Sequence, residues 1–338
     1  MEARVASNVD IVIITYNQEE FIEPCIRSAV EQTAHNVRIT IIDDCSSDRT
    51  PEIAEALARQ CGNARFLRNE KNLGERHTSN KAFATTNGDY FLLLHGDDLL
   101  HPRFVEETVN NGLEKHPSCS FSYALASRIV GGEVIDDLYQ FIPRLATGPH
   151  DLLPYLCFTN WISPSFGIMR RSACEKFGAI QSYIDKKAPT FLDHYMYSRL
   201  AAHGDCYVVS ERLGQYRIHD KQTSSVIRQR MNEYAIVVYD LIFSDVEHFD
   251  VKHRYMAKAN QIGRLLTMNG IARTVLEMIR SPEIAPILRP TAAALLTTIA
   301  DTLGNFTFDS SRDASARNFQ LEDPRNLDVL RSAASKIS

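Results

Sequence analysis

Apolar runs of strand length alternate with helical patterns over the first hundred residues. The strand-length runs lie at 9–15, 37–43, 64–68 and 90–94, and helical patterns follow at 19–32, 52–60 and 75–85. Runs that are apolar throughout are typical of parallel strands whose two faces are both covered by helices. The pattern therefore predicts an α/β fold with a doubly wound, mostly parallel, Rossmann-like sheet.

Polar side chains follow three of these predicted strands at the point where each one ends. Thr15-Tyr16-Asn17 closes the first strand, Asp43-Asp44 the second, and Asp97-Asp98 follows the fourth. Ligands of open α/β sheets bind outside the C-terminal ends of the strands. We therefore expect these three groups to share one ligand site.

The alternation loosens beyond residue 118 and becomes helical after about residue 226. The pattern predicts a hairpin at 127–135, a helix at 191–202 and strands near 207–209 and 213–218. Helices are expected from 226 to about 303, followed by a polar tail. The predicted organisation is a domain at 1–225, divided into halves of about 1–100 and 101–225, and a helical region at 226–338.

Composition and charge narrow the function classes. The 338 residues carry 37 Lys and Arg against 42 Asp and Glu, a net charge of −5, which argues against a broad nucleic-acid surface. Seven cysteines without any Cys-x-x-Cys pair indicate neither a disulfide framework nor a zinc site. The N-terminus has no export pattern, and prolines and polar residues interrupt the uncharged stretch 152–169. A cytoplasmic location is expected.

Two acidic pairs are the first candidates for chemistry. Asp97-Asp98, on a glycine-containing turn, offers the hard oxygen ligands that suit Mg²⁺ or Mn²⁺. The alternative is that the pair caps the helix expected from Pro102. Asp43-Asp44 can accept hydrogen bonds from a base or a ribose, or can simply form a polar turn.

Four single residues carry weaker signals, each with an ordinary alternative. Asp193 can act as a general base or can favour the start of a helix through the helix dipole. His219 can bind a metal or phosphate, Arg76 can neutralise phosphate, and Trp161 can line a sugar pocket. A surface position is the commoner explanation for His219 and Arg76, and core packing explains Trp161 at least as well.

The joint order of these motifs is more specific than any one of them. Residues 7–225 contain, in sequence, VDIVIITYNQEEFIEPCIRSAVEQT, ITIIDDCSSDRTPEIAE, NEKNLGERHTSNKAFATTNGDYFLLLHGDD, FLDHYMYSRL and YRIHDKQTS. This series resembles the family-2 glycosyltransferases of the GT-A fold, which are enzymes that use nucleotide-sugar donors.

The resemblance implies roles for residues at the strand ends. The donor site would be formed by Thr15, Tyr16 and Asn17 around the nucleotide, Asp44 on the base, Asn72, Gly74 and Arg76 near the diphosphate, and Asp97 with Asp98 beside the donor sugar. Asp97 and His219 would hold the metal ion, Mg²⁺ or Mn²⁺. Asp193 would be the general base.

Two positions depart from the family pattern. His95 stands where the first acid of an Asp-x-Asp element is expected, and Leu192 replaces the Glu that precedes the catalytic Asp. The first change removes a carboxylate near the donor, while the second leaves the base in place.

The predicted function is an inverting, metal-dependent transfer from a nucleotide-diphosphate sugar, a UDP-sugar by preference. The acceptor is a hydroxyl of a glycan, a lipid-linked glycan or a small molecule, as in cell-envelope polysaccharide biosynthesis. One alternative is a nucleotidyltransferase, although Tyr16-Asn17-Gln18-Glu19 stands where its glycine-rich phosphate loop is expected. The other alternative is a non-catalytic subunit that binds sugar nucleotides.

The C-terminal helices leave three roles open. They can pack on the catalytic domain, form a homo-oligomer interface, or rest on a membrane surface. The last role would place the protein at the inner face of the cell membrane.

Overall fold

The computed structural model describes residues 7–135, 145–157, 159–178, 192–220, 222 and 231–268. Contacts divide the chain into two compact units, Met1–Gln229 and Arg230–Ser338. The first unit contains every residue proposed for the ligand site. Its fold is mixed α/β around a large, mostly parallel sheet, as the sequence pattern predicted.

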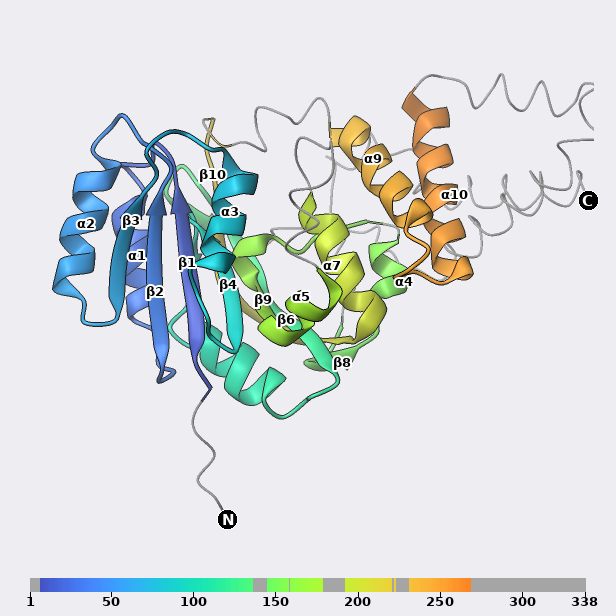
Figure 1. The fold of residues 1–338 in the computed structure, drawn as a ribbon, viewed down its shortest axis with the longest axis horizontal. Coiled ribbons are helices and arrows are strands. Elements are labelled where there is room, and N and C mark those ends of the chain that lie inside the picture. The colour runs from blue at the N-terminus through green and yellow to red at the C-terminus, as the bar shows by residue number, and fades with distance from the viewer. Residues whose placement is uncertain are drawn as a thin grey trace, which may run out of the picture. The chain divides into compact units, whose positions relative to one another are not determined.

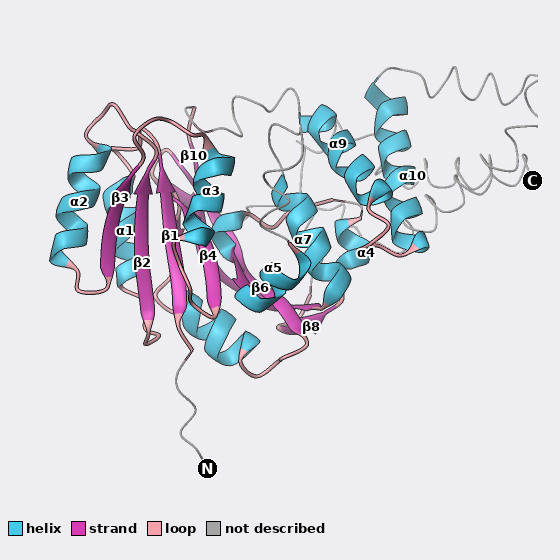
Figure 2. Cartoon of the chain, in the orientation of Figure 1, coloured by secondary structure: helices cyan, strands magenta, loops and turns pink. Residues whose placement is uncertain are grey.

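Four parallel strands form the first half of this sheet. They are β1 (Val9–Thr15), β2 (Val37–Asp43), β3 (Ala64–Arg68) and β4 (Tyr90–His95), in the spatial order β3-β2-β1-β4. In Figures 1 and 2 the arrowheads of β1, β2 and β3 point to the same edge. Every residue of β1 is buried, because helices cover both of its faces.

Three helices cover these strands. α1 (Ile22–Val30) and α2 (Thr50–Gln60) pack on the face that carries Val9, Ile11 and Ile13, and α3 (Glu75–Ala84) lies on the other face (Figure 1). The first helix begins at Ile22 instead of the predicted residue 19. The reason is local, since Asn17 has a left-handed φ of 52° and the N–H of Phe21 donates to Gln18 O, which closes a turn.

The second half of the unit combines strands of both directions. The remaining strands are β5 (Leu99–Leu100), β6 (Cys119–Val130), β7 (Glu133–Ile135), β8 (Gly148–His150), β9 (Gly167–Arg170) and β10 (Asp205–Ile218). The sheet path continues from β4 through β9, β6 and β10 to β5, with β9 antiparallel to both of its neighbours. The predicted hairpin at 127–135 is present as β6 and β7.

Two sequence predictions in this half need correction. The strands expected at 207–209 and 213–218 are one strand, β10, whose register against β6 shifts between Val209 and Gly214. The bulge interrupts the hydrophobic alternation, so the pattern indicated two strands. The helix expected from Pro102 is a π-helix, η1, over Glu106–Leu113.

Short helices complete this half. They are α4 (Leu153–Leu156), η2 (Pro164–Phe166), α5 (Arg171–Phe177) and α7 (Leu192–His203). α7 is held on α4 by the ring of His194, whose Nε2 lies 2.6 Å from Leu156 O. This contact fixes the helix that carries Asp193.

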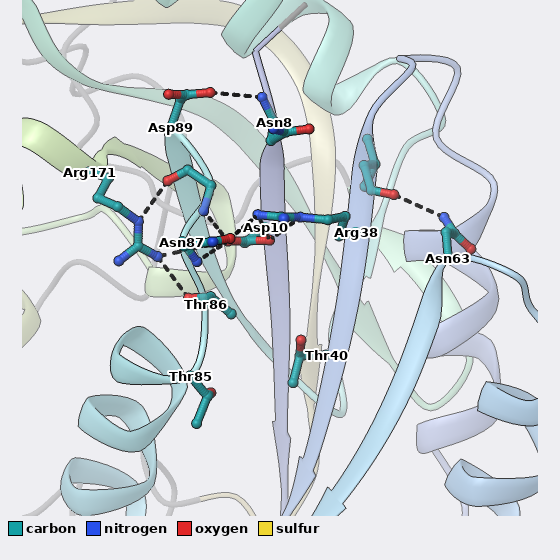
Figure 3. A network of polar contacts seen from close by, with 12 residues as sticks. Asn8, Asp10, Arg38, Thr40, Asn63, Thr85, Thr86, Asn87, Asp89 and Arg171 are labelled. Atoms are coloured by element: carbon teal, nitrogen blue, oxygen red, sulfur yellow. Dashed lines mark hydrogen bonds and ion pairs between the residues drawn. The ribbon is translucent and has the colours of Figure 1, made fainter.

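A polar network closes the opposite edge of the sheet, at the N-terminal ends of β1 and β4 (Figure 3). Asp10 accepts hydrogen bonds from Arg38 Nε at 2.9 Å and from the N–H of Asn87 at 3.0 Å. Arg171 lies 3.8 Å from the same carboxylate and donates to Gly88 O and to Thr86 Oγ1. Because β9 and α5 meet at Arg171, this network ties the two halves of the unit together.

The described part of the second unit consists of α9 (Met231–Ser244) and α10 (Val251–Met268). Arg254 Nε donates to Phe243 O at 2.6 Å, and Arg254 and Lys258 both lie over the Phe243 ring. None of the helices in the described ranges is long and apolar enough to cross a bilayer. The helices predicted beyond residue 268 and the polar tail lie outside the described residues.

Candidate active site

The first strand end presents an exposed aromatic ring. Thr15 is buried, and its Oγ1 donates to Gln18 Oε1 at 2.8 Å. Asn17 bridges to the next strand end, since its N–H donates to Ser46 Oγ and its Oδ1 accepts from the N–H of Ser47. Tyr16, 47% exposed between these anchored residues, is therefore available to stack on a planar ligand.

Asp44 organises the loop that precedes α3. Its carboxylate accepts hydrogen bonds from the N–H groups of Leu73 and Gly74 at 2.9 and 2.8 Å and from Asn69 Nδ2 at 2.7 Å. Gly74 has a φ of 78°, a conformation that favours glycine. Asn72 Oδ1 also accepts from the Gly74 N–H. Asp44, Asn72 and Gly74 are thus brought together, with the Asp44 carboxylate already well supplied with donors.

Asp43 keeps one carboxylate oxygen that accepts no hydrogen bond from the described residues, whereas both oxygens of Asp44 accept hydrogen bonds. Asp43 Oδ2 accepts from the N–H of Ser46 and pairs with Arg68 Nε at 3.1 Å. Its Oδ1 is buried and has no hydrogen-bond partner within the described residues. The sequence prediction assigned base contact to Asp44, and only the three-dimensional hydrogen bonds distinguish the two adjacent acids.

The turn after β4 carries Asp97 and Asp98. Gly96 allows this turn, because a Cβ there would collide with the side chains of Thr15 and Gln18. Asp97 Oδ2 lies 3.0 Å from His219 Nε2, at the end of β10. The structure therefore brings together the two residues predicted to bind a metal ion, although they are separated by 122 positions in the chain.

Asp98 is the more deeply buried of the two acids. Its Oδ2 accepts from Ser165 Oγ at 2.6 Å and its Oδ1 from the N–H of Arg217 at 3.0 Å. Burial and the charge of Asp97 raise the pKa of Asp98 to about 7. A cation bound beside these two carboxyl groups would favour their charged form.

Arg217 and Phe21 belong to the site but were not assigned to it from the sequence. Arg217 Nε donates to Asp97 O at 2.9 Å, and its guanidinium lies 4.9 Å from the centre of the Phe21 ring. The His219 ring lies 4.7 Å from the same ring. Phe21, just before α1, thus packs against both Arg217 and His219. In the sequence, an aromatic side chain in a turn was the one feature that could have indicated its role in the site.

A basic residue, His95, stands at the position where the family pattern expects an acid. Its Nε2 lies 3.3 Å from Glu75 Oε1 on α3. Burial opposes protonation, but the hydrogen bond and charge of Glu75, with the charges of Asp98 and Asp97, raise the pKa of His95 to about 9. The replacement of the expected acid by His95 therefore does not leave this position without a carboxylate, because Glu75 lies against the His95 ring. Arg76 follows Glu75 in the first turn of α3.

Asp193 lies in the first turn of α7, directly after Leu192. Its Oδ2 accepts a hydrogen bond from Asn160 Nδ2 at 2.9 Å. Burial raises the pKa of Asp193 to about 7, with a further contribution from the charge of Glu75, while backbone hydrogen bonds and His95 oppose the shift. Glu75 pairs with His95, which directly precedes the turn that carries Asp97 and Asp98, and the charges of Glu75 and His95 both act on Asp193.

The residues present fit a divalent cation that is only partly coordinated by protein. Within the described ranges no group of three or more His, Cys, Asp and Glu side chains could enclose an ion. Asp97 and His219 form a two-ligand set. Mg²⁺ is commonly bound through one or two carboxylates, and water and substrate phosphate oxygens complete its shell. Asp97 supplies one such carboxylate and His219 adds an imidazole, so a bound diphosphate and water would provide the remaining ligands.

Comparison with known proteins now identifies the family. The model of the family described as glycosyl transferase family 2 matches residues 10–177. The chain belongs to this family. The match covers β1 to α5 and thus the acidic strand ends. It ends before α7 and β10, so it does not include Asp193, Arg217 or His219.

Several relatives are glycosyltransferases by name. An uncharacterized glycosyltransferase of Haemophilus influenzae is 28% identical over 67% of this chain and 70% of its own length. A putative glycosyltransferase of Bacillus subtilis, EpsH, is 26% identical over 39% of this chain and 38% of its own length. The family and these relatives identify the chain as a glycosyltransferase.

Solved structures share its fold. The structure of Staphylococcus aureus TarS 1-349 in complex with UDP-GlcNAc has a TM-score of 0.62 at 16% identity, covering 97% of this chain and 91% of TarS 1-349. The mannosyltransferase PcManGT of Pyrobaculum calidifontis, in complex with GDP-Man and Mn²⁺, has a TM-score of 0.57 at 14% identity, covering 99% and 87%. The fold is therefore that of the GT-A glycosyltransferases.

Proposed function

We propose that this glycosyltransferase moves a sugar from a UDP-sugar to an acceptor hydroxyl, with inversion at the anomeric carbon and with a divalent metal ion. The observation that carries the proposal is the position of Asp193. Asn160 holds the Asp193 carboxylate, and Ser165, five residues further along the chain, holds Asp98 beside the Asp97–His219 pair at the C-terminal edge of the sheet. Burial raises the pKa of the Asp193 carboxylate to about 7.

The donor nucleotide would bind across the first two strand ends. Tyr16 would stack on the base, Thr15 and Asn17 would shape the pocket, and the Asp43-Asp44 pair would accept hydrogen bonds from the base or ribose. A UDP-sugar is favoured because TarS, which shares the fold, is described in complex with UDP-GlcNAc. The Asn72–Gly74 turn and Arg76 would lie along the diphosphate.

In the reaction, Asp193 would remove the proton from the acceptor hydroxyl as its oxygen attacks the anomeric carbon. The new glycosidic C–O bond forms while the bond from that carbon to the diphosphate oxygen breaks. The proton goes to Asp193, and the electron pair leaves with the nucleoside diphosphate. A base with a pKa near the working pH is well matched to this transfer. Attack from the side opposite the leaving group inverts the configuration.

Asp97 and His219 would hold Mg²⁺ or Mn²⁺, with Asp98 shaping the donor-sugar side. When bound, such an ion stabilises negative charge on the departing diphosphate. PcManGT, a structural neighbour, is described with Mn²⁺. Arg217, supported by the Phe21 ring, would add a fixed positive charge beside Asp97.

The wider assignment follows from the same chemistry. The acceptor would be a glycan, a lipid-linked glycan or a small molecule of cell-envelope polysaccharide synthesis. Residues 1–225 would form the transferase domain, and 226–338 a helical region that mediates homo-oligomerisation or peripheral contact with the inner face of the membrane. The expected location is cytoplasmic.

One observation favours a second candidate, a non-catalytic subunit that binds sugar nucleotides. His95 and Glu75 form an ion pair where the family pattern has an acid alone. A donor panel tests both functions: UDP- and GDP-sugars are added with and without Mn²⁺, and melting temperature and nucleoside diphosphate release are measured. We expect a Mn²⁺-dependent shift with a UDP-sugar, because a ligand that binds only the folded state stabilises it, together with release of UDP.

The outcomes of the panel separate the candidates. Binding without diphosphate release for any donor would favour the subunit. Release that is independent of Mn²⁺ would contradict metal dependence, and a shift restricted to GDP-sugars would contradict the choice of base.

A further inference from the structure

One buried segment touches both sides of the proposed active site. Residues 160–166, which we call the bridging segment, run from the end of the α4 region into β9. Asn160 at one end contacts Asp193, and Ser165 near the other end contacts Asp98. Only this short stretch of chain separates the two contacts.

The Asn160 contact is fixed by the turn in which Asn160 lies. Its Oδ1 accepts the N–H of Ile162 at 3.0 Å, and its Nδ2 donates to Ile162 O at 3.2 Å as well as to Asp193 Oδ2. The side-chain amide therefore has one orientation, with the NH₂ toward the carboxylate. Donation to one oxygen of Asp193 defines how the carboxylate is turned.

The Ser165 contact ties the other end to the turn after β4. Ser165 is fully buried, and its Oγ donates to Asp98 Oδ2 at 2.6 Å. Ser165 Oγ also accepts a hydrogen bond from the N–H of His95 at 3.2 Å. Both the strand end and the acid that follows it are therefore held by one hydroxyl.

The apolar residues of the bridging segment are buried and tightly packed. Trp161, Ile162 and Phe166 are at most 5% exposed. The Trp161 ring meets Tyr123 and Tyr155 edge to face, at centroid distances of 6.3 and 6.2 Å. Beyond the segment, Tyr197 of α7 donates to Gly167 O at 3.1 Å, so the helix that carries Asp193 is also attached to the start of β9.

We propose that Asn160 and Ser165 are positioning residues, and that the bridging segment sets the separation between the proposed base Asp193 and the donor-site acid Asp98. This inference rests on the proposed function. Glycosyl transfer requires the acceptor oxygen and the anomeric carbon to approach within about 3–3.5 Å, and a displacement of about 1 Å can cost roughly 100-fold in rate. A rigid link between the two acids would supply this alignment.

The two ends predict different kinetic effects. Asn160→Ala frees the Asp193 carboxylate, so we expect kcat to fall roughly 10-fold or more with little change in the donor KM. Ser165→Ala loosens the donor side, so we expect mainly a higher donor KM. Ser163→Ala is the matched control, because Ser163 lies in the same buried segment and its side chain forms no hydrogen bond with Asp193 or Asp98. This variant should retain the wild-type kcat and donor KM.

The pH profile separates positioning from a merely structural role. A hydrogen bond donated to a carboxylate favours its charged form, so its loss in Asn160→Ala should move the acid limb of kcat/KM to higher pH. The other groups that act on Asp193, namely Glu75 of α3, His95 of β4 and Tyr197 of α7, are unchanged in this variant. Asn160→Asp, of the same size but with repelling charge, should move the limb further, and it serves if Asn160→Ala does not fold.

The full-length chain is used for all variants, with Asp193→Asn measured in parallel. Inactive Asp193→Asn together with a wild-type kcat and an unshifted pH profile in the Asn160 variants would overturn the role of Asn160 and leave the base assignment intact. A wild-type donor KM in Ser165→Ala would overturn the role of Ser165. Full activity of Asp193→Asn would instead contradict the proposed function.

Discussion

Each edge of the sheet buries an aspartate, but the two carboxylates differ in how far neighbouring groups compensate their charge. At the N-terminal edge, Asp10 is surrounded by Arg38, Arg171 and the N–H groups of Asn87 and Gly88 (Figure 3). At the C-terminal edge, the Asp98 carboxylate accepts hydrogen bonds from a serine hydroxyl and one backbone N–H in the described part of the chain, and it has Asp97 beside it and His95 nearby.

This difference distinguishes a structural carboxylate from one that is left for a ligand. Two guanidinium groups, of Arg38 and Arg171, compensate the buried charge of Asp10 and join β1, β2, α5 and the turn that precedes β4. At the other edge the pKa values of Asp98 and Asp193 are both raised to about 7, chiefly by burial. Buried acids without full compensation are characteristic of functional sites, and substitutions at the two edges should therefore have different consequences.

The largest expected effect at the C-terminal edge, apart from loss of the base itself, comes from Asp97→Asn. Removing the carboxylate that lies against His219 should lower kcat/KM roughly 100-fold or more, the scale of losing an electrostatic stabiliser. The melting temperature should no longer respond to Mn²⁺ in the presence of a donor. A Mn²⁺-dependent shift of wild-type size would show that Asp97 is not a ligand.

At the N-terminal edge, Asp10→Asn should reduce stability and leave catalysis nearly intact. The change leaves the donors of Arg38 and Arg171 imperfectly paired, at a cost of about 1–3 kcal/mol in the free energy of unfolding. Urea denaturation measures this loss, and kcat per folded molecule should stay close to wild type. A large loss of kcat in the folded variant would erase the distinction between the two edges.

The wild-type rate should depend on pH through the ionisation of Asp193. Only the deprotonated carboxylate can accept the acceptor's proton, and the pKa of Asp193 is about 7. Below this value kcat/KM should fall about tenfold per pH unit. The measurement is kcat/KM from pH 5 to 9 at saturating Mn²⁺, and a flat profile between pH 5 and 7 would contradict a base with a raised pKa.

The smallest expected effect is on stability at the active site itself. Folding raises the pKa of Asp193 above its ordinary value of 3.8, so the protonated acid favours the folded state at low pH, and this contribution is lost as the pH rises through about 7. Asp193→Asn should therefore melt higher than wild type at pH 8 but not at pH 4. A gain of about 1 kcal/mol corresponds to about 2–4 °C for a domain of this size.

Much of the fold followed from periodicity. The strands β1 to β4 and the helices between them are marked by apolar runs and turn residues, because strands buried on both faces leave a strong pattern. The antiparallel β9 and the bulged β10 were not predicted as such. Their placement depends on long-range pairing and on a register shift that local alternation does not encode.

The candidate site was predictable in its acids and less so in their supports. Asp97 and His219 meet as the motif order implied. Arg217, Asn160 and Ser165 contribute through contacts with residues distant in the chain, and no local pattern marks them. Phe21 had one local signal, an aromatic side chain in a turn, but its contacts with Arg217 and His219 are also long-range. Which of the two acids, Asp43 or Asp44, keeps an unused acceptor oxygen also depends on a long-range contact. The N–H groups of Leu73 and Gly74 donate to Asp44, while Asp43 Oδ1 has no hydrogen-bond partner within the described residues.

The most direct test of the central claim is nucleoside diphosphate release by wild type and Asp193→Asn, with a bound donor, Mn²⁺ and an acceptor. The account predicts UDP release and glycosylated acceptor from wild type, and a loss of about 100-fold to 10,000-fold in Asp193→Asn. Donor binding, followed by melting temperature, should be retained. Near-wild-type release by this variant, with donor bound, would contradict the assignment of the C-terminal edge and Asp193 as the site of glycosyl transfer.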